Sequence, residues 1–416
     1  MSLTSEPEAQ SLPFLGMAPF LRMSIAGIDF SSMAQEMIAL AEKAPEDATL
    51  WMNLATAMMS LKHEELGLQI QNQALQMQRV YHWHARQPTK LRVLMLMVPG
   101  NLSANIPLDC LLEDSDIDLI NYYVDPTAPH PLTSPVPEHD LVMVAIGASD
   151  EQSAVLQRLE NVLRDWPTPV LNPPQNVPNS ERHNASILLQ NVPGLVICPA
   201  LHISRQSLQS VAAGEKSVSD IADDHAFPII LRPVGSHGGH GLQKVDNREA
   251  VASYLQQNDE DTFFLSRFVD YSGDDGLFRK MRLVLIDGKA YACHMGVSSN
   301  WMIHYVNAGM YEDENKRAQE ARFLNEFADF AARHHDALDA ISQRTGLEYI
   351  GIDCAETQSG ELLIFEIDPA MVVHAMDDEV MFPNKQIHMH KVKTAMREML
   401  LQRAGKTLQP IYATQV

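Results

Sequence analysis

Hydrophobic positions change their period near residue 87, which divides the chain into a helical first part and a part where strands and helices alternate. From about Ser31 to His84, apolar residues recur every three or four positions, the period of a helix with one buried face. Pro45 interrupts this pattern and predicts that one helix ends there and another begins. Residues 1–30 have no strong period, and we expect a partly ordered leader there.

Large and small residues occupy distinct places in the helical segment, residues 31–86. Trp51 and Leu54 are large, whereas Gly67 and Ala74 are small enough for close helix packing. With this arrangement the segment resembles a tetratricopeptide repeat. The resemblance spans fewer than two repeats, and about three are needed for an independent solenoid. We therefore expect a helical cap that packs on the rest of the chain, with a peptide- or protein-binding surface as the alternative.

Continuous apolar runs follow, and they have the length and composition of strands buried on both faces. The runs cover 91–98, 117–124 and 141–147, and a shorter one lies near Val170. A helical pattern separates the third run from the fourth. Strands that alternate with crossovers favour a small parallel α/β domain over residues 88–175.

Two further lobes are expected between residues 176 and 405. In the first, residues 176–270, the best strands cover 226–234 and 261–269. In the second, residues 271–405, an Asp-Gly turn joins two strands into an antiparallel hairpin. The other elements expected in this second lobe are a long helix over 315–345, strands over 349–356 and 361–368, and a helix near 385–403.

The charge balance argues against several classes of partner. The 416 residues carry a formal net charge of −22, so nucleic acid and anionic membranes are repelled. No apolar run reaches the roughly 18 residues that a membrane helix needs, and the first ten residues are acidic and polar, unlike a signal peptide. Cys110, Cys198, Cys293 and Cys354 lie far apart, as expected for free thiols in a reducing cytosol. We expect a cytoplasmic protein.

A glycine-rich loop follows the strand that ends near Arg232, and its glycines permit backbone N–H groups to approach phosphate oxygens. The loop has neither the spacing of a P-loop nor a clean Gly-x-Gly-x-x-Gly pattern, so an ordinary glycine-rich hairpin stays the alternative. Its candidate nucleotide-binding residues are Gly235, Ser236, Gly238, Gly239 and Gly241.

Basic residues begin the next hairpin, where Lys280 and Arg282 share one face of a strand. They are either the charges of an edge strand or part of an anion site. The polar stretch 298–309 that follows is interpreted as a substrate loop or a disordered surface.

Carboxylates collect on the last hairpin. Asp353 ends an apolar strand, and Glu366 and Asp368 share a face of the next one, where Glu366 can lie opposite Asp353. Three carboxylates on one face repel each other unless a cation lies between them, and oxygen ligands of this kind suit Mg²⁺. Solvated carboxylates are the alternative interpretation.

The order of these motifs resembles that of the ATP-grasp superfamily, especially its carboxylate–amine ligases. The family pattern is a basic residue before a glycine-rich flap, a hinge strand, an arginine on the following strand and carboxylates on a hairpin. The sequence has these features as LRPVGSHGGHG, FFLSRFVD, KMRLVLIDGK and a hairpin with Asp353, Glu366 and Asp368. The resemblance covers about residues 180–400, and residues 91–175 would be the pre-grasp domain.

The resemblance implies roles for individual residues. Asp353 and Glu366 would bind Mg²⁺ that bridges the phosphates of ATP, and Arg282 would steady the transferred phosphate. Arg232 stands where the phosphate-binding lysine is usual, and Asp368 where an asparagine is usual. The adenine hinge would comprise Leu265, Ser266, Arg267 and Phe268, and Arg205 would be a further phosphate contact.

The implied activity is ATP-dependent joining of a carboxylate, on a small molecule or peptide, to an amine through an acyl phosphate. His237 and His240 are expected to have structural or solvent-facing roles, with a phosphate contact on closure of the flap as the alternative. Trp301 and His304 lie where relatives hold their acceptor substrate. Because Arg replaces Lys and Asp replaces Asn, the alternatives are a catalytically drifted protein that binds a nucleotide or a partner, and a phosphotransferase. Relatives are commonly dimers, so the resemblance permits a homodimer and leaves the oligomeric state open.

Overall fold

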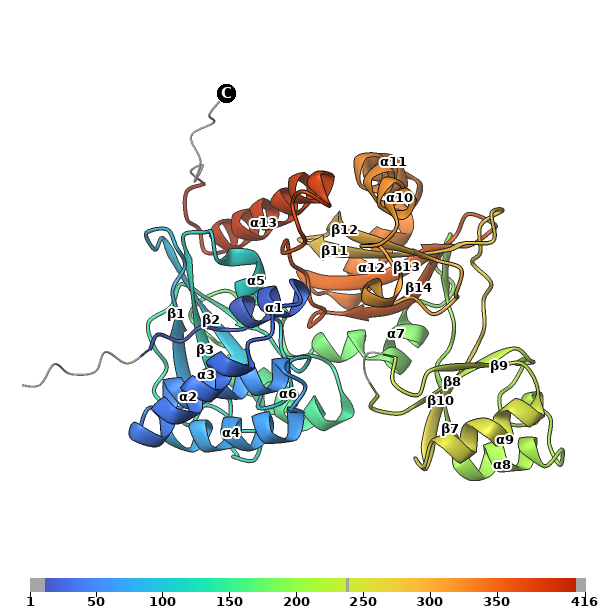
Figure 1. The fold of residues 1–416 in the computed structure, drawn as a ribbon, viewed down its shortest axis with the longest axis horizontal. Helices are drawn as coiled ribbons and strands as arrows, with labels where there is room; N and C mark the ends of the chain where they lie inside the picture. The colour runs from blue at the N-terminus through green and yellow to red at the C-terminus, as the bar shows by residue number, and fades with distance from the viewer. Residues whose placement is uncertain (1–11, 237–238, 409–416) are drawn as a thin grey trace, which may run out of the picture. The chain divides into compact units, whose positions relative to one another are not determined.

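The chain folds into two compact units in the computed structural model, which describes residues 12–236 and 239–408 (Figure 1). Unit 1 contains the N-terminal part of the chain together with the segment that begins at Pro369. Unit 2 is formed mainly by residues 176–368. The expected fold class is confirmed, because helices are combined with a parallel sheet in unit 1 and two largely antiparallel sheets in unit 2.

Helices form the beginning of unit 1, and their apolar faces share a core that includes Leu54 and Ile70. The predicted break at Pro45 is confirmed, since Asp47 begins a new helix by accepting a hydrogen bond from the backbone N–H of Leu50 at 3.0 Å. These helices are α1 (Ala18–Ile25), α2 (Ser31–Lys43), α3 (Ala48–Ser60) and α4 (Glu64–Met77).

Close packing between α3 and α4 depends on Gly67, because a Cβ there would lie 3.0 Å from the carbonyl oxygen of Ala55. The leader packs on the same helices. The buried Asn53 side chain accepts from the backbone N–H of Leu15 and donates to the carbonyl of Pro13, each at 2.9 Å. The helical segment therefore packs within unit 1. Its resemblance to tetratricopeptide repeats stays a prediction, and so does a partner that binds its surface.

The prediction that the helical pattern continues to His84 is wrong. Helix α4 ends at Met77, and the chain continues as strand β1 (Val80–Trp83), which pairs antiparallel with a later strand. Tyr81 and Trp83 are buried and His82 between them is exposed, so the local period is that of a strand.

A sheet with the order β1-β3-β2-β4-β5 forms the centre of unit 1 (Figure 1). All neighbours except β1 and β3 are parallel, as the apolar runs predicted. The strands are β2 (Leu91–Met97), β3 (Ile117–Tyr123), β4 (Leu141–Val144) and β5 (Val170–Leu171), and helices α5 (Asp109–Leu112) and α6 (Ser153–Leu163) lie between them in the chain.

The final helix, α13 (Pro383–Arg403), packs in unit 1 rather than with the lobe to which the sequence assigned it. The guanidinium of Arg397 donates to both carboxylate oxygens of Asp116 at 2.7 Å, and these side chains are buried. Lys393 pairs with Asp114 at 3.2 Å. These ion pairs join α13 to the sheet of unit 1, although the paired residues are about 280 positions apart in the chain. A local sequence pattern cannot reveal a contact between segments so far apart.

The first sheet of unit 2 has the order β7-β10-β8-β9, and all its pairs are antiparallel. Helices α8 (Arg205–Ala212) and α9 (Arg248–Gln257) lie side by side against it (Figure 1). The strands are β7 (Leu201–Ser204), β8 (Ile229–Pro233), β9 (Gln243–Val245) and β10 (Thr262–Arg267).

The second sheet has the order β12-β11-β13-β14-β6. The predicted Asp-Gly hairpin joins β11 to β12, with Asp287 and Gly288 at φ of +50° and +79°. The strands are β6 (Leu195–Ile197), β11 (Phe278–Ile286), β12 (Lys289–Ser298), β13 (Tyr349–Glu356) and β14 (Leu362–Asp368).

The long helix predicted over 315–345 is wrong, since the segment forms α10 (Glu314–Asn325), α11 (Phe327–Arg333) and α12 (His335–Thr345). His334, at the second break, is buried, and its Nε2 lies 2.9 Å from a carboxylate oxygen of Glu356. This tertiary contact holds the ring inward at the point where the helical geometry ends. None of the helices in the described parts of the chain is long and apolar enough to cross a membrane.

The buried ion pair between Asp116 and Arg397 generates a stability prediction for unit 1. Asp116→Asn leaves the Arg397 charge buried without its partner and is expected to cost about 3 kcal/mol. Asp114→Asn, at a more exposed pair, should cost under about 1 kcal/mol. Hydrogen exchange of the amides in β2, β3 and α13 measures the loss of stability in each variant. Equal losses of stability in the two variants would contradict the structural role given to the pair of Asp116 and Arg397.

Candidate functional site

A row of charged side chains crosses the second sheet of unit 2. Arg282 on β11 lies opposite Asp353 on β13, and Asp353 lies opposite Glu366 on β14. Residues directly opposite in neighbouring strands point to the same face of a sheet. The predicted pairing of Asp353 with Glu366 is therefore confirmed. Asp368 lies two residues beyond Glu366 on the same face, opposite Gly351.

Asp353 is the centre of this row. Its carboxylate is buried and accepts hydrogen bonds from Arg282 Nε at 2.8 Å and Nη2 at 3.0 Å, and Lys280 Nζ lies 2.7 Å away. Burial alone would raise the pKa of Asp353, but Arg282 and Lys280 hold that pKa well below its ordinary value. Pairing with Asp353 likewise outweighs the effect of burial on Arg282 and raises its pKa.

Arg182, which the sequence analysis missed, holds Glu366. It is the first residue of α7 (Arg182–Leu188), and its Nη2 donates to Glu366 Oε1 at 2.7 Å while its Nη1 donates to the carbonyl of Phe365 at 3.0 Å. A cation at a helix N-terminus is opposed by the helix dipole. That local mismatch is the signal that could have marked Arg182 as a residue with a tertiary role.

Arg232 on β8 approaches the row from the first sheet. Burial, and then the charge of Arg182, lower the pKa of Arg232 to about 10, while Glu366 opposes this shift. The guanidinium donates to Ser236 Oγ at 3.2 Å and to the Ser236 carbonyl. Arg232 therefore braces the start of the glycine-rich loop and lies within electrostatic reach of the carboxylate hairpin.

Cations outnumber carboxylates at this site, although the whole chain is strongly acidic. Such an excess suits an anion with several charges. Within the described parts of the chain, no three His, Cys, Asp or Glu side chains are placed to hold a metal ion by themselves. The cations are Arg182, Arg232, Lys280 and Arg282, and the carboxylates are Asp353, Glu366 and Asp368.

The glycine-rich loop has the backbone that its sequence predicts. Gly235, Gly239 and Gly241 all have positive φ, which side chains with a Cβ rarely adopt. A Cβ on Gly239 would collide with the ring of His304, so the loop lies against the polar stretch 298–309. The predicted residues His237 and Gly238 lie outside the described residues.

The stretch 298–309 is held in place rather than being a disordered surface. The buried carboxylate of Glu320 accepts from the Tyr305 hydroxyl at 2.8 Å and from the backbone N–H of Met295 at 3.0 Å. Lys316 Nζ donates to the Ala308 carbonyl at 2.6 Å. Burial, and then Lys280, lower the pKa of His304 in this loop.

The residues predicted to form the hinge have two different environments, the core of the first sheet and the contact with the 298–309 loop. The Leu265 side chain belongs to the core of the first sheet, and Ser266 and Arg267 pair with β8. Phe268 packs edge-on against Trp301, with ring centroids 5.8 Å apart, and Lys244 Nζ lies 4.5 Å from the Phe268 ring centre. The end of this strand therefore contacts the 298–309 loop.

Arg205 has a different environment from the other predicted phosphate contacts. Its Nε donates to the Glu260 carbonyl at 2.9 Å and its Nη1 to the Leu255 carbonyl at 3.2 Å, and Nη2 donates to the Asn258 carbonyl. The guanidinium thus fastens the end of α9, and these hydrogen bonds are to backbone carbonyls rather than to the carboxylates of the charged row.

The chain is similar to several proteins that are named as ligases or synthetases. No family model matches the chain. A tetrahydromethanopterin:alpha-L-glutamate ligase from Methanococcus maripaludis is 20% identical over 220 residues, which cover 52% of this chain and 70% of the ligase. The D-alanyl-alanine synthetase A of Vibrio cholerae is a solved structure with a TM-score of 0.45 and 14% identity, covering 76% of this chain and 99% of its own.

A RimK-domain ATP-grasp protein from Sphaerobacter thermophilus has a TM-score of 0.42 and 13% identity, over 75% of this chain and 99% of its own. These TM-scores lie below 0.5, which is too low for residues of the neighbours to be carried over. The chain is a mixed helix-and-sheet protein with an ATP-grasp protein among its structural neighbours.

The pairing of Asp353 with two cations generates a prediction for unit 2. Asp353→Asn leaves Arg282 and Lys280 to repel each other and should destabilise β11 and β13 by about 3–5 kcal/mol at neutral pH. Hydrogen exchange of the amides in these strands measures the change. Asp329→Asn, on an exposed position of α11, is the matched control. A small effect equal to the control would contradict the central role of Asp353.

The same pair predicts a dependence on pH. Because the pKa of Asp353 is lower in the folded state, the ion pair contributes its full stability above the ordinary value of 3.8 and loses it as pH falls towards the folded value. The wild type should therefore lose stability in β11 and β13 between about pH 5 and pH 2, more steeply than Asp353→Asn. If the stabilities of the wild type and Asp353→Asn changed with pH in the same way, this dependence on Asp353 would be contradicted.

Proposed function

We propose that the chain is an ATP-dependent ligase that joins a carboxylate to an amine through an acyl phosphate, with release of ADP and phosphate. The observation that carries the proposal is the row of Arg282, Asp353 and Glu366 across one sheet face, with Arg182 and Arg232 close to Glu366. Cations around paired carboxylates suit a triphosphate whose charge must be neutralised during phosphoryl transfer. The similarity to ligases supports the same class.

The phosphates of ATP would lie between the glycine-rich loop and the cation row. Arg182 and Arg232 offer planar donors to phosphate oxygens, and the N–H groups around Gly235 and Gly239 can close over them. The carboxylate substrate attacks the terminal phosphorus, the bond to the ADP oxygen breaks, and ADP leaves. Arg282 and Lys280 would stabilise the charge that develops on the transferred group.

Magnesium fits the donor set under one condition. Glu366 and Asp368 offer carboxylate oxygens on one face, which suit a hard cation. Asp353 can join them only when Arg282 and Lys280 exchange its carboxylate for phosphate oxygens, because they hold both of its oxygens. When bound, Mg²⁺ would neutralise phosphate charge. Phosphate binding and metal binding are therefore proposed to depend on each other.

The second half of the reaction would take place beneath the 298–309 loop. The amine attacks the acyl carbon, the bond to the phosphate oxygen breaks, and inorganic phosphate leaves with the proton that the amine loses. Trp301 and His304 lie next to the hinge end and the glycine-rich loop, so they are proposed to enclose this step and exclude water.

One observation favours the alternative that the protein has lost catalytic activity and only binds a nucleotide. Asp353 is held by two cations and Glu366 by Arg182, so both of these carboxylates have cationic partners without any nucleotide. If these pairs do not exchange partners, ATP would bind through the arginines alone and Mg²⁺ would add nothing.

Calorimetric titration of ATP with and without Mg²⁺ distinguishes the two functions. The ligase predicts that Mg²⁺ strengthens ATP binding and that Glu366→Gln weakens this Mg²⁺-dependent binding by about tenfold or more. Glu361→Gln, the same change at the turn of the same hairpin, is expected to have no effect. ATP binding of the same affinity with and without Mg²⁺ would favour the protein that binds a nucleotide without catalysis.

Product formation tests the reaction class. ADP release should require a carboxylate and an amine together, and Arg282→Met should lower kcat by about a hundredfold or more because it removes charge stabilisation in phosphoryl transfer. ADP release is followed in a coupled assay across candidate acid and amine pairs. ADP release that continues with the acid alone would instead indicate a phosphotransferase or hydrolase.

A further inference from the structure

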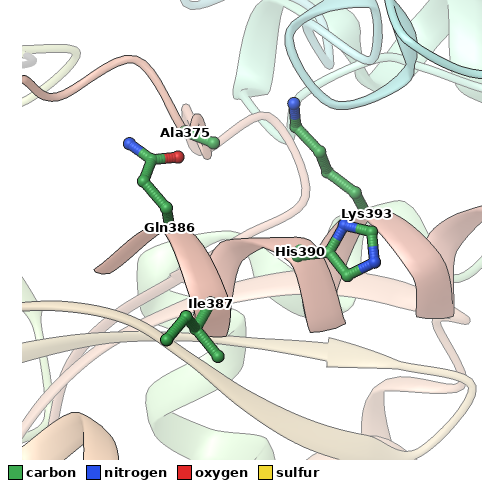
Figure 2. Close-up of a pocket in the computed structure, with 5 residues that line it drawn as sticks. All are labelled: Ala375, Gln386, Ile387, His390 and Lys393. Atoms are coloured by element: carbon green, nitrogen blue, oxygen red, sulfur yellow. The ribbon is translucent and has the colours of Figure 1, made fainter. Parts of the chain in front are cut away.

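A cavity of about 440 Å³ lies along α13 in unit 1, and its charges are balanced. Figure 2 shows the residues that line it, which are Ala375, Gln386, Ile387, His390 and Lys393. Lys393 pairs with Asp114 at 3.2 Å, and the buried Lys385 of the same helix pairs with Asp377 at 2.9 Å. The wall therefore offers no excess charge that would select a ligand.

Unit 2 contains two tyrosine hydroxyls that each hold one loop of the charged site by a backbone carbonyl. Tyr254, on α9, donates to the carbonyl of Gly241 at 2.9 Å, at the end of the glycine-rich loop. Tyr271, in the link between β10 and β11, donates to the carbonyl of Trp301 in the 298–309 loop. Both tyrosine side chains are buried. The two hydrogen bonds thus end in the two loops that the proposed function gives to different substrates.

The glycine-rich loop is fixed at both of its ends. Arg232 braces the start of the loop through Ser236, and Tyr254 holds the end. Gly241 has a φ of +64°, and a Cβ there would lie 2.5 Å from Pro233 Cδ, so the chain passes closely over β8 at this point. A bond to the Gly241 carbonyl therefore helps to set the path of the loop beside the cation row.

Tyr254 has firm support of its own. Its ring packs edge-on against Phe263 of β10, with ring centroids 5.5 Å apart, and its carbonyl accepts from the Asn258 side chain at 2.9 Å. Arg205 donates to the carbonyls of Leu255 and Asn258 at the same end of α9. Arg205 therefore supports the glycine-rich loop indirectly, through the end of α9 and Tyr254.

Tyr271 connects three parts of the site. Its ring packs edge-on against Phe278 at the start of β11 and against Phe365 of β14, with ring centroids 4.9 and 5.0 Å apart. Its hydroxyl reaches the carbonyl of Trp301. One side chain therefore ties the loop that contains Trp301 to the strand that carries Glu366.

We propose that Tyr254 and Tyr271 are positioning residues for different substrates, Tyr254 for ATP through the glycine-rich loop and Tyr271 for the amine through the 298–309 loop. The inference rests on the proposed ligase function and deepens it. A hydroxyl that holds a loop in its binding form raises the apparent affinity, because affinity scales with the fraction of molecules in that form. Loss of one such hydrogen bond shifts the fraction by about two- to tenfold.

Phenylalanine variants test this division, because each removes one hydroxyl and keeps the ring that packs. In the calorimetric titration, Tyr254→Phe should weaken ATP binding about fivefold, whereas Tyr271→Phe should change it by less than about twofold. Tyr122→Phe is the matched control, since its hydroxyl donates to the Ser134 carbonyl at 2.7 Å in unit 1. The control should leave ATP affinity unchanged.

Hydrogen exchange without any ligand reports on each loop directly. The backbone N–H of Leu242 donates to the Gly239 carbonyl at 3.1 Å, and that of Asn300 donates to Ser298 Oγ at 3.0 Å. Exchange should become about fivefold faster at Leu242 in Tyr254→Phe, and at Asn300 in Tyr271→Phe. Unchanged exchange in β10 and β11 would show that the fold of the variants is intact.

The ADP-release assay separates positioning from a general loss of stability. It uses the acid and amine pair that gives the fastest release in the wild type. Tyr271→Phe should raise the KM of the amine about fivefold and leave the KM of ATP within about twofold, and Tyr254→Phe should do the reverse.

Equal effects of the two variants on ATP and on the amine would overturn the proposed division, as would effects no larger than those of Tyr122→Phe. ADP release by the wild type with unchanged KM values in both variants would overturn only the roles of Tyr254 and Tyr271. If the wild type binds ATP but releases no ADP with any acid and amine pair, the ligase proposal fails. ATP affinity and hydrogen exchange then still decide whether each hydroxyl positions its loop.

Discussion

The buried carboxylate of Asp353, shared between Arg282 and Lys280, is the interaction on which unit 2 depends. A carboxylate at this depth is tolerated only when cations and hydrogen bonds replace water. The two cations come from β11 and the carboxylate from β13, so the pairing fixes the relation of these strands as well as their charges. The remaining charged residues of the site are arranged around this centre.

A site built in this way is already neutralised before a ligand arrives. Arg182 holds Glu366 as Arg282 and Lys280 hold Asp353. In the proposed function, ATP would have to compete with these carboxylates for the cations, and the carboxylates that it displaces would become available to a metal ion. Each exchange replaces one ion pair by another, so the net change in free energy is small compared with that of the individual pairs. Under the proposed function, this exchange would couple phosphate binding to metal binding.

Rigid supports surround the site where substrates would enter. Glu320 anchors the 298–309 loop from beneath, and Phe268 and Trp301 pack together at the end of the hinge strand. Gly239 lies directly against His304, which leaves no room there for a side chain. The glycine-rich loop and the 298–309 loop therefore share a contact, and a change in either affects the other.

The sequence by itself determined the longer apolar strands, the Asp-Gly hairpin and the placement of Asp353 opposite Glu366, because a period of two and a tight turn fix which side chains share a face. Tertiary structure alone decided that Arg182 holds Glu366, that Arg205 fastens α9 and that α13 packs in unit 1 through Arg397. It also broke the helix predicted over 315–345, where His334 turns inward to Glu356. Periodicity reports only neighbours along one element, whereas an ion pair between distant segments depends on how whole elements pack.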